Sequence, residues 1–223
     1  MWDQTNTTKH DHAPNIFASD GRIYQIEYAR EAVALGAPAI GITFKDGVVL
    51  ATVKRSGNKL VKLASVHKIF SIDDHISVAV SGMIADGMIL VEAARTLAAN
   101  HTIQYGEPIT IEAVVNQMSA AMVCSTRGGD RPFGVGCLLA GITESGPVLY
   151  EIDPSGSVLG LFAGAIGSGR NDANGKLVLE YSEGMDREAA LKLAGTTLVR
   201  AGGDVSEETL EVIVLSEAGD VEE

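Results

Sequence analysis

The sequence has 223 residues, of which 46% are apolar and 21% charged, a balance typical of one globular domain with a large core. Its 17 basic and 29 acidic residues give a net charge of −12, which disfavours nucleic acid as a partner because phosphates need a basic face. Two cysteines and five scattered histidines exclude a disulfide framework and a four-ligand zinc site. No apolar run approaches the roughly 18 residues of a membrane span, and the start lacks a signal peptide, so we expect a cytoplasmic protein without membrane contact.

The amino-terminal part of the chain divides into a polar arm and a helix. Residues 1–15 carry no apolar period and predict a flexible segment ahead of a single domain at 16–223. The helix is expected to begin with Ser19 or Asp20 as its N-cap and to end at Gly36, because apolar residues recur between them at three- and four-residue spacing.

After this helix, strand and helix patterns follow each other in groups. The segments predicted to be strands are 39–44, 48–53, 67–72, 76–81, 135–142, 148–152, 158–163 and 210–215. The segments predicted to be helices are 83–100, 110–122, 172–181 and 186–200. Groups of strands separated by helix pairs predict an α+β fold with four layers, αββα: two antiparallel sheets packed together with a helix pair on each outside face, plus the N-terminal helix.

Two further features have structural interpretations. Cys124 and Cys137 lie among apolar residues and are expected to be buried small hydrophobes rather than nucleophiles. The Gly167-Ser168-Gly169 stretch before a helix is not a phosphate-binding P-loop, because five residues instead of four separate Gly169 from Gly175, and Leu177 stands where Ser or Thr would reach magnesium. We predict a strand-to-helix turn there.

Several motifs occur in a fixed order along the chain. The first is Phe17-Ala18-Ser19-Asp20-Gly21-Arg22-Ile23-Tyr24-Gln25-Ile26-Glu27-Tyr28-Ala29-Arg30-Glu31-Ala32-Val33. The later ones span 66–69, 81–86, 105–108, 129–135, 153–156 and 166–169. In order and spacing they resemble the α-type subunits of the 20S proteasome, with the archaeal members nearest, over residues 10 to about 216. That family has the αββα sandwich that the periodicity predicts.

The family also contains catalytic β-type chains, which use an N-terminal threonine as nucleophile and its amine as base. When the chain is aligned with them on residues 39–42, the nucleophile position falls on Ala37 and the supporting aspartate position on Val53. A methyl group cannot attack a peptide carbonyl, and the predicted helix continues into the strand where catalytic relatives have a free amine. We therefore predict that this chain is not itself an enzyme.

The resemblance implies a pocket between neighbouring subunits that accepts the C-terminal tail of an activator. Lys68 is the member of the catalytic set that persists, and its ammonium would hold the tail's carboxylate while Gly82 lets the backbone approach. Gly21, Arg22 and Glu27 complete the pocket by resemblance. From the residues alone, a solvated lysine at a strand end is the favoured interpretation of Lys68, and only the resemblance reverses that order.

The resemblance also places a gate in the N-terminal segment. Archaeal α subunits commonly carry a Tyr-Asp-Arg triplet where this chain has His10, Asp11 and His12, so only Asp11 matches. Ser19 stands where the family usually has the proline of a reverse turn, and serine restrains φ less than proline. We expect a looser gate. Two histidines in a polar tail supply too few ligands for a metal site.

These features imply a non-catalytic α subunit that forms the outer heptameric ring of a 20S core, docks on β subunits and an ATPase activator, and gates the entry of unfolded polypeptide. No cofactor is expected. A divergent ring-forming paralogue without a β partner remains open, because the gate triplet is altered and the tail after the last strand is short. A free-standing N-terminal-nucleophile amidohydrolase also remains open, although Ala37 argues against it.

Overall fold

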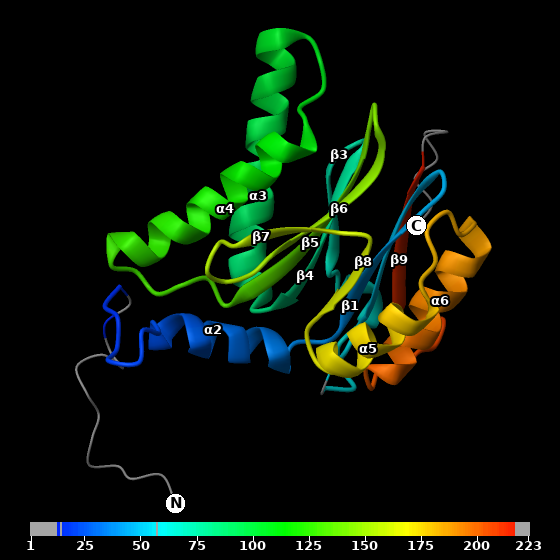
Figure 1. Cartoon of the computed structure of the whole chain (residues 1–223), viewed down its shortest axis with the longest axis horizontal. Helices are drawn as coiled ribbons and strands as arrows, with labels where there is room; N and C mark the ends of the chain where they lie inside the picture. The colour runs from blue at the N-terminus through cyan, green and yellow to red at the C-terminus, as the bar shows by residue number, and fades with distance from the viewer. Residues whose placement is uncertain (1–12, 14, 57, 217–223) are drawn as a thin grey trace, which may run out of the picture.

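The computed structural model describes residues 13, 15–56 and 58–216, and within them two antiparallel sheets pack face to face (Figure 1). The four-stranded sheet has the order β8-β1-β2-β9, with β1 at Ala39–Phe44, β2 at Gly47–Val53, β8 at Ala163–Ile166 and β9 at Leu210–Ser216. The five-stranded sheet has the order β3-β4-β5-β6-β7, with β3 at Ile69–Asp73, β4 at Ile76–Gly82, β5 at Val135–Thr143, β6 at Gly146–Ile152 and β7 at Val158–Leu161.

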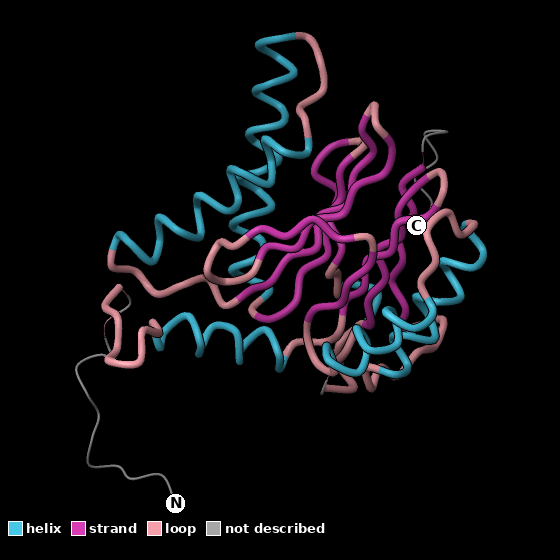
Figure 2. The backbone as a smooth tube through the Cα atoms, in the orientation of Figure 1, coloured by secondary structure: helices cyan, strands magenta, loops and turns pink. Residues whose placement is uncertain are grey.

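A helix pair covers the outer face of each sheet (Figure 2). The helices against the five-stranded sheet are α3 (Ile84–Tyr105) and α4 (Ile111–Gly128), and those against the four-stranded sheet are α5 (Arg170–Glu180) and α6 (Arg187–Arg200). The core between the sheets contains Leu50, Leu138 and Leu149, each at most 2% exposed. The predicted four-layer α+β sandwich is confirmed.

The remaining helix, α2 (Tyr24–Leu35), lies across one end of the sandwich and packs against β4 and β5. Its buried residues are Ala29 and Val33. Val33 packs so closely on β5 that a Cβ on Gly136 would lie 3.1 Å from its Cγ1 atom. The N-terminal helix was therefore predicted correctly as an element, and its inner face is covered by the chain's own sheet.

The prediction that α2 begins at Ser19 or Asp20 is wrong by several residues. The residue before the helix is Ile23, which has no side-chain cap, while residues 18–21 form a turn in which the Gly21 amide donates to the carbonyl of Ala18. The carboxylate of Asp20 accepts from the amide and guanidinium of Arg22 instead of capping the helix. A local side-chain bond thus competes with helix formation here.

Two other boundaries also differ from prediction. The helix predicted at 83–100 continues to Tyr105, where Gly106 ends it at φ 73°. The strand predicted at 158–163 is interrupted at Phe162, and its two halves are β7 in one sheet and β8 in the other. A single apolar run therefore crosses between the sheets.

The prediction for the cysteines is half right. Cys137 is fully buried in β5, and burial raises the pKa of its thiol to about 12. Cys124 is exposed on α4, because the buried face of that helix carries Met118 and Met122. In the described ranges no helix is long and apolar enough to cross a membrane.

Candidate functional site

The link between α2 and β1 is the centre of the first candidate site. The carbonyl oxygen of Ala37 accepts two hydrogen bonds, from Lys68 Nζ at 3.1 Å and from Ser81 Oγ at 2.8 Å. Lys68 is only 5% exposed and Ser81 is fully buried. Lys68 is therefore not a solvated lysine at a strand end, and the alternative interpretation of this residue is wrong.

Burial also changes the acid–base properties of Lys68. Removal of the ammonium from water and the positive charge of Arg55 both lower its pKa, Glu211 opposes them, and the pKa falls to about 8 in total. Glu211 in β9 also accepts from the Lys68 backbone amide at 2.9 Å, which is why β3 begins at Ile69 rather than at His67 as predicted. The site thus holds a cation whose charge is lost at mildly alkaline pH.

Close backbone approach at this link requires glycine. Gly82 has φ 105°, and a Cβ there would lie 2.3 Å from the carbonyl oxygen of Gly134. A Cβ on Gly36 would lie 2.4 Å from the Gly82 amide nitrogen, and a Cβ on Gly167 would lie 2.5 Å from Ser81 Oγ. The predicted turn at residues 167–169 is confirmed, since Gly167 and Gly169 have positive φ and α5 begins at Arg170.

Two groups were not assigned a role from the sequence. Ser81 was part of a family motif, yet its bond to Ala37 depends on a partner 44 residues away. Asp86 accepts from both terminal nitrogens of Arg131 at 2.6 and 2.8 Å and from the Gly134 amide at 2.8 Å. Hydrogen bonding from Arg131 holds the pKa of Asp86 below its usual range. These bonds fix the glycine-rich loop that packs against Gly82.

The other predicted pocket residues lie toward the opposite end of α2. Gly21 and Arg22 precede the helix, and Arg22 is bonded to Asp20 while its guanidinium lies 5.6 Å above the Tyr24 ring. Twelve helical residues span about 18 Å, so one copy of the chain does not bring Arg22 to Lys68. Ser19 is exposed in the turn, and His10, Asp11 and His12 lie outside the described residues.

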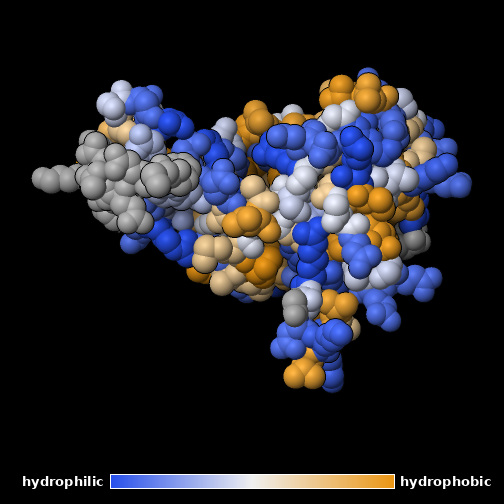
Figure 3. Space-filling model, turned by 90° about the horizontal axis from the view of Figure 1, so that it is seen from below, coloured by the Kyte–Doolittle hydropathy of each residue, from blue (hydrophilic) through white to orange (hydrophobic). Residues whose placement is uncertain are grey.

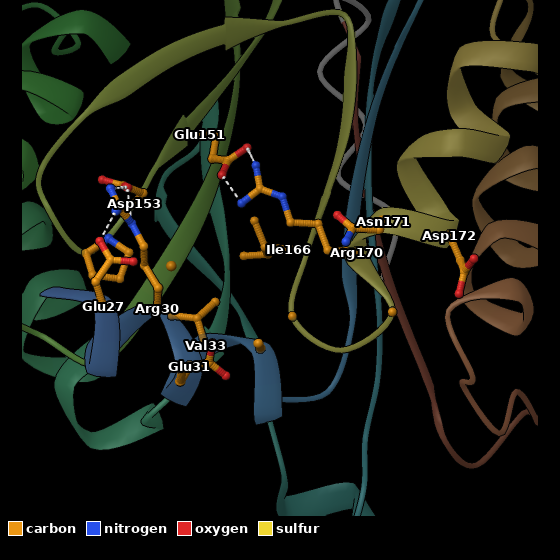
Figure 4. A pocket seen from close by; sticks show the side chains of 15 residues that line it. Glu27, Arg30, Glu31, Val33, Glu151, Asp153, Ile166, Arg170, Asn171 and Asp172 are labelled. Carbon is orange, nitrogen blue, oxygen red and sulfur yellow. Dashed lines mark hydrogen bonds and ion pairs between the residues drawn. The ribbon is translucent and has the colours of Figure 1, made fainter. Parts of the chain in front are cut away.

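A groove beside α2 contains Glu27, the remaining predicted residue (Figure 4). This cavity of about 530 Å³ lies between α2, the end of β6 and the start of α5. Arg30 bridges Glu27 at 2.8 Å and Asp153 at 2.6 Å, and Arg170 pairs with Glu151 at 2.8 Å. The groove, named here the α2 groove, is therefore lined by ion pairs that connect α2 and α5 to β6 and the loop that follows it.

The pKa values of the two acids of β6 and its loop shift in opposite directions. For Glu151, desolvation raises the pKa despite the nearby Arg170. For Asp153, desolvation acts in the same direction, but hydrogen bonds from Ser155 and Arg30 outweigh it and lower the pKa. Asp153 is thus the more firmly ionised partner, and its bond to Arg30 fixes α2 against the loop after β6.

The described groups that contact the carbonyl of Ala37 are hydrogen-bond donors. Ala37 carries a methyl group, and Val53, where the sequence analysis expects the position of the supporting aspartate, is a fully buried strand residue. The Ser81 hydroxyl donates to a backbone carbonyl. Among the residues that the structure describes, no group of three or more His, Cys, Asp or Glu side chains is placed to hold a metal ion.

Comparison with known proteins agrees with this architecture. A family model described as "Proteasome subunit" matches residues 33–215, and a second model, for the N-terminal signature of A-type proteasome subunits, matches residues 10–32. The chain is 44% identical over 208 residues to the proteasome alpha subunit of Methanocaldococcus jannaschii, and 45% identical over 208 residues to that of Thermococcus sibiricus; each alignment covers 93% of this chain and 80% of the relative. It is 42% identical over 211 residues to the one from Methanococcus maripaludis, with 94% and 82% covered. The chain therefore belongs to the proteasome subunit family, as one of its α-type members.

Proposed function

We propose that this chain builds the outer heptameric ring of a 20S proteasome core, as a non-catalytic α subunit that docks on a ring of β subunits. The observation that carries the proposal is the match to the α-type N-terminal signature at residues 10–32. The methyl side chain at Ala37, where a catalytic relative needs a hydroxyl, supports the non-catalytic role. The role of the ring is to restrict access to the proteolytic chamber, since a narrow entrance excludes folded proteins.

In this proposal residues 1–15 form the gate and residues 16–223 the ring-forming domain. Unfolded polypeptide passes the gate toward the threonines of the β subunits, in the cytoplasm, after an ATPase partner has unfolded it. His10, Asp11 and His12 replace the family's gate triplet, and Ser19 replaces its turn proline. A gate built from these residues closes less firmly, because fewer of the family's contacts are available to it.

The activator pocket is proposed to form between two copies. Lys68 and Gly82 of one copy would face Gly21, Arg22 and Glu27 of the next, which is consistent with their separation within a single chain. An ammonium carries three N–H donors, and the bond to the Ala37 carbonyl uses one of them. A tail carboxylate would accept from a second donor and would be the counter-ion of Lys68. The low exposure of Lys68 favours a partner that excludes water, as an inserted tail does.

Assembly and inactivity are tested together. The purified chain is analysed by native mass spectrometry alone and with candidate β chains, and both preparations are assayed with fluorogenic peptides. We expect sevenfold rings, and peptide hydrolysis only when β chains are present. A chain that remains monomeric in both preparations, or hydrolyses peptides unaided, would contradict the proposal.

The activator pocket is tested with Lys68→Ala, and Lys192→Ala, an exposed lysine of α6, is the matched control. A hydrogen bond to a charged group contributes about 1.5–3 kcal/mol, and several tails bind one ring, so we expect stimulation by an activator with a C-terminal hydrophobic-tyrosine-any motif to be lost. Ring assembly should be unchanged in both variants. Equal half-maximal activator concentrations for wild type and Lys68→Ala would show that Lys68 does not anchor the carboxylate.

A further inference from the structure

Glu211 connects two groups at the end of the sheets where Lys68 lies. Its Oε2 atom accepts from the Lys68 backbone amide at 2.9 Å, and its Oε1 atom lies 3.2 Å from Nδ1 of His67. The side chain of Glu211 is only 12% exposed, whereas that of His67 is 56% exposed. One nearly buried carboxylate therefore joins the backbone of Lys68 to an imidazole that solvent reaches.

The place of Glu211 in β9 explains why its side chain meets Lys68. Glu211 lies opposite Thr52 of β2, and Ile213 and Leu215, further along the same strand, pack in the core between the sheets. Side chains two residues apart lie on the same face of a strand, so Glu211 lies on this inner face, at its end. Lys68, directly before β3, comes to the same end from the other sheet.

Glu211 also acts on the ammonium of Lys68. Its negative charge favours the protonated form and so raises the pKa of Lys68, against the effects of burial and of Arg55. A tail carboxylate would be a second anion beside the same ammonium, and two anions at short distance repel each other. Glu211 would therefore weaken the binding of a tail while it keeps Lys68 charged.

Arg55, in the loop after β2, is the second charged group that acts on Lys68. That loop stands off the body of the protein at the lower edge of Figure 3, with hydrophilic side chains around an apolar tip. Arg55 also lines a cavity of about 790 Å³ between this loop and the segment before β9, whose other charged residues are Lys54, Lys59, Asp204 and Glu208. Two of these are basic and two acidic, so their charges offset one another. Of the side-chain types gathered around Lys68, only the imidazole of His67 ordinarily changes its charge between about pH 5 and 8.

We propose that Glu211 is a positioning residue for Lys68 in the activator pocket, and that His67 adjusts the binding of a tail carboxylate through the charge it carries beside Glu211. This inference rests on the proposed activator pocket and adds its regulation by pH. While His67 is neutral, the carboxylate of Glu211 opposes the tail. When His67 gains a proton, the imidazolium offsets that carboxylate, and the tail binds more tightly.

Binding of a tail peptide to assembled rings of the full chain tests the proposal. The probe is a short peptide that ends in Leu-Tyr-Ala with a free carboxylate and carries at its N-terminus a dye whose emission does not depend on pH. The same peptide with a C-terminal amide is the reference, because it lacks the charge that Lys68 would bind. Fluorescence anisotropy gives the dissociation constants at pH 6.0, 7.5 and 9.0.

Two variants separate the two roles. His67→Gln removes the imidazole, and Glu211→Gln removes the charge but keeps an oxygen that can accept from the Lys68 amide. His101→Gln, in α3, is the control for the first, because His101 contacts a backbone carbonyl instead of a carboxylate. Glu92→Gln, at an exposed position of the same helix, is the control for the second. Since His67 is exposed, His67→Gln tests the proposal even if Glu211→Gln impairs folding.

Wild-type rings should bind the carboxylate peptide about three- to fivefold more tightly at pH 6.0 than at pH 7.5, as expected for one added charge near the pocket. In His67→Gln this difference should fall below about 1.5-fold, the part that Lys68 itself contributes through its pKa of about 8. Glu211→Gln should bind about threefold more tightly than wild type at pH 6.0. That advantage should shrink at pH 9.0, because without Glu211 the ammonium loses its proton at lower pH.

The amide peptide should bind more weakly and without this pH dependence, and both controls should behave as wild type. Equal pH dependence in wild type and His67→Gln would overturn the role of His67. An unchanged affinity in Glu211→Gln, or an advantage that is the same at every pH, would overturn the role of Glu211. In either case the pocket itself stands if the carboxylate peptide still binds more tightly than the amide. Wild-type rings that bind both peptides equally, or neither, would overturn the pocket and this inference together.

Discussion

Lys68 Nζ lies 3.1 Å from the carbonyl oxygen of Ala37, so the cation proposed to receive an activator tail is bonded directly to the link between α2 and β1. Ser81 donates to the same oxygen. A ligand that attracts the ammonium would therefore act on a bond that holds the C-terminal end of α2, the helix that follows the segment proposed as the gate. The contribution of each donor to the stability of the link can be measured by removing the two donors one at a time.

Ser81→Ala removes one of the two donors to Ala37. The free energy of unfolding should fall by about 0.5–1.5 kcal/mol, the net contribution of a buried hydrogen bond. Ser65→Ala is the control, because Ser65 also donates to a backbone carbonyl, that of Lys62, but is exposed. Urea denaturation measures both. If the free energy of unfolding fell as much in Ser65→Ala as in Ser81→Ala, the buried bond to Ala37 would contribute no more than an exposed one.

Gly82→Ala tests the close backbone approach beside Lys68. Its φ of 105° costs an L-residue about 1–3 kcal/mol, and the new Cβ would meet the Gly134 carbonyl oxygen at 2.3 Å. Gly175→Ala is the contrasting change, because Gly175 lies inside α5 with no atom within 4 Å of an added Cβ. It should stabilise by about 0.5–1 kcal/mol. The expected thermal melts therefore shift in opposite directions, and equal shifts would be inconsistent with this geometry.

The buried charge of Lys68 predicts a pH dependence. Its pKa is about 8 in the folded chain against an ordinary value of 10.5, so between these values the unfolded chain binds more protons. Stability should accordingly rise with pH from about 8 to 10.5, by about 3 kcal/mol at most. In Lys68→Met this rise is absent. The measurement is the difference in Tm between wild type and Lys68→Met at pH 7.5 and pH 9.5, and a difference that is the same at both values contradicts the prediction.

The bond between Asp86 and Arg131 predicts an effect at acid pH. The pKa of Asp86 lies below its ordinary value of 3.8, so the stability it contributes is present above that value and is lost as the pH falls through the lower, folded-state pKa. Arg131→Gln should cost about 1.5–3 kcal/mol at pH 7 and progressively less at low pH. Arg95→Gln removes an exposed i,i+3 pair with Glu92 and a hydrogen bond to the Ser71 carbonyl, neither of which involves a buried carboxylate, so it should cost less than Arg131→Gln at pH 7. Guanidinium titrations at pH 7 and pH 3 distinguish the two variants.

Local sequence signals were sufficient for the order of the elements. The Asp46-Gly47 pair marks the hairpin turn between β1 and β2, whose register runs from Ala39 opposite Thr52 to Phe44 opposite Gly47. Apolar periodicity separated strands from helices in the right groups, because the side chains that a layer buries repeat with the period of its own backbone. The prediction that the chain has no catalytic nucleophile rests on the methyl side chain of Ala37 and stays a prediction.

Only the tertiary structure decided what surrounds those residues. Lys68 is buried because Glu211, 143 residues away, binds its backbone amide and Ala37 accepts its ammonium. Asp20 pairs with Arg22 rather than capping α2, and one apolar run at 158–166 is divided between two sheets. The α2 groove likewise combines residues of α2, β6 and α5. Such outcomes depend on which distant segments meet, and the free energy of those contacts is not contained in any local window of the sequence.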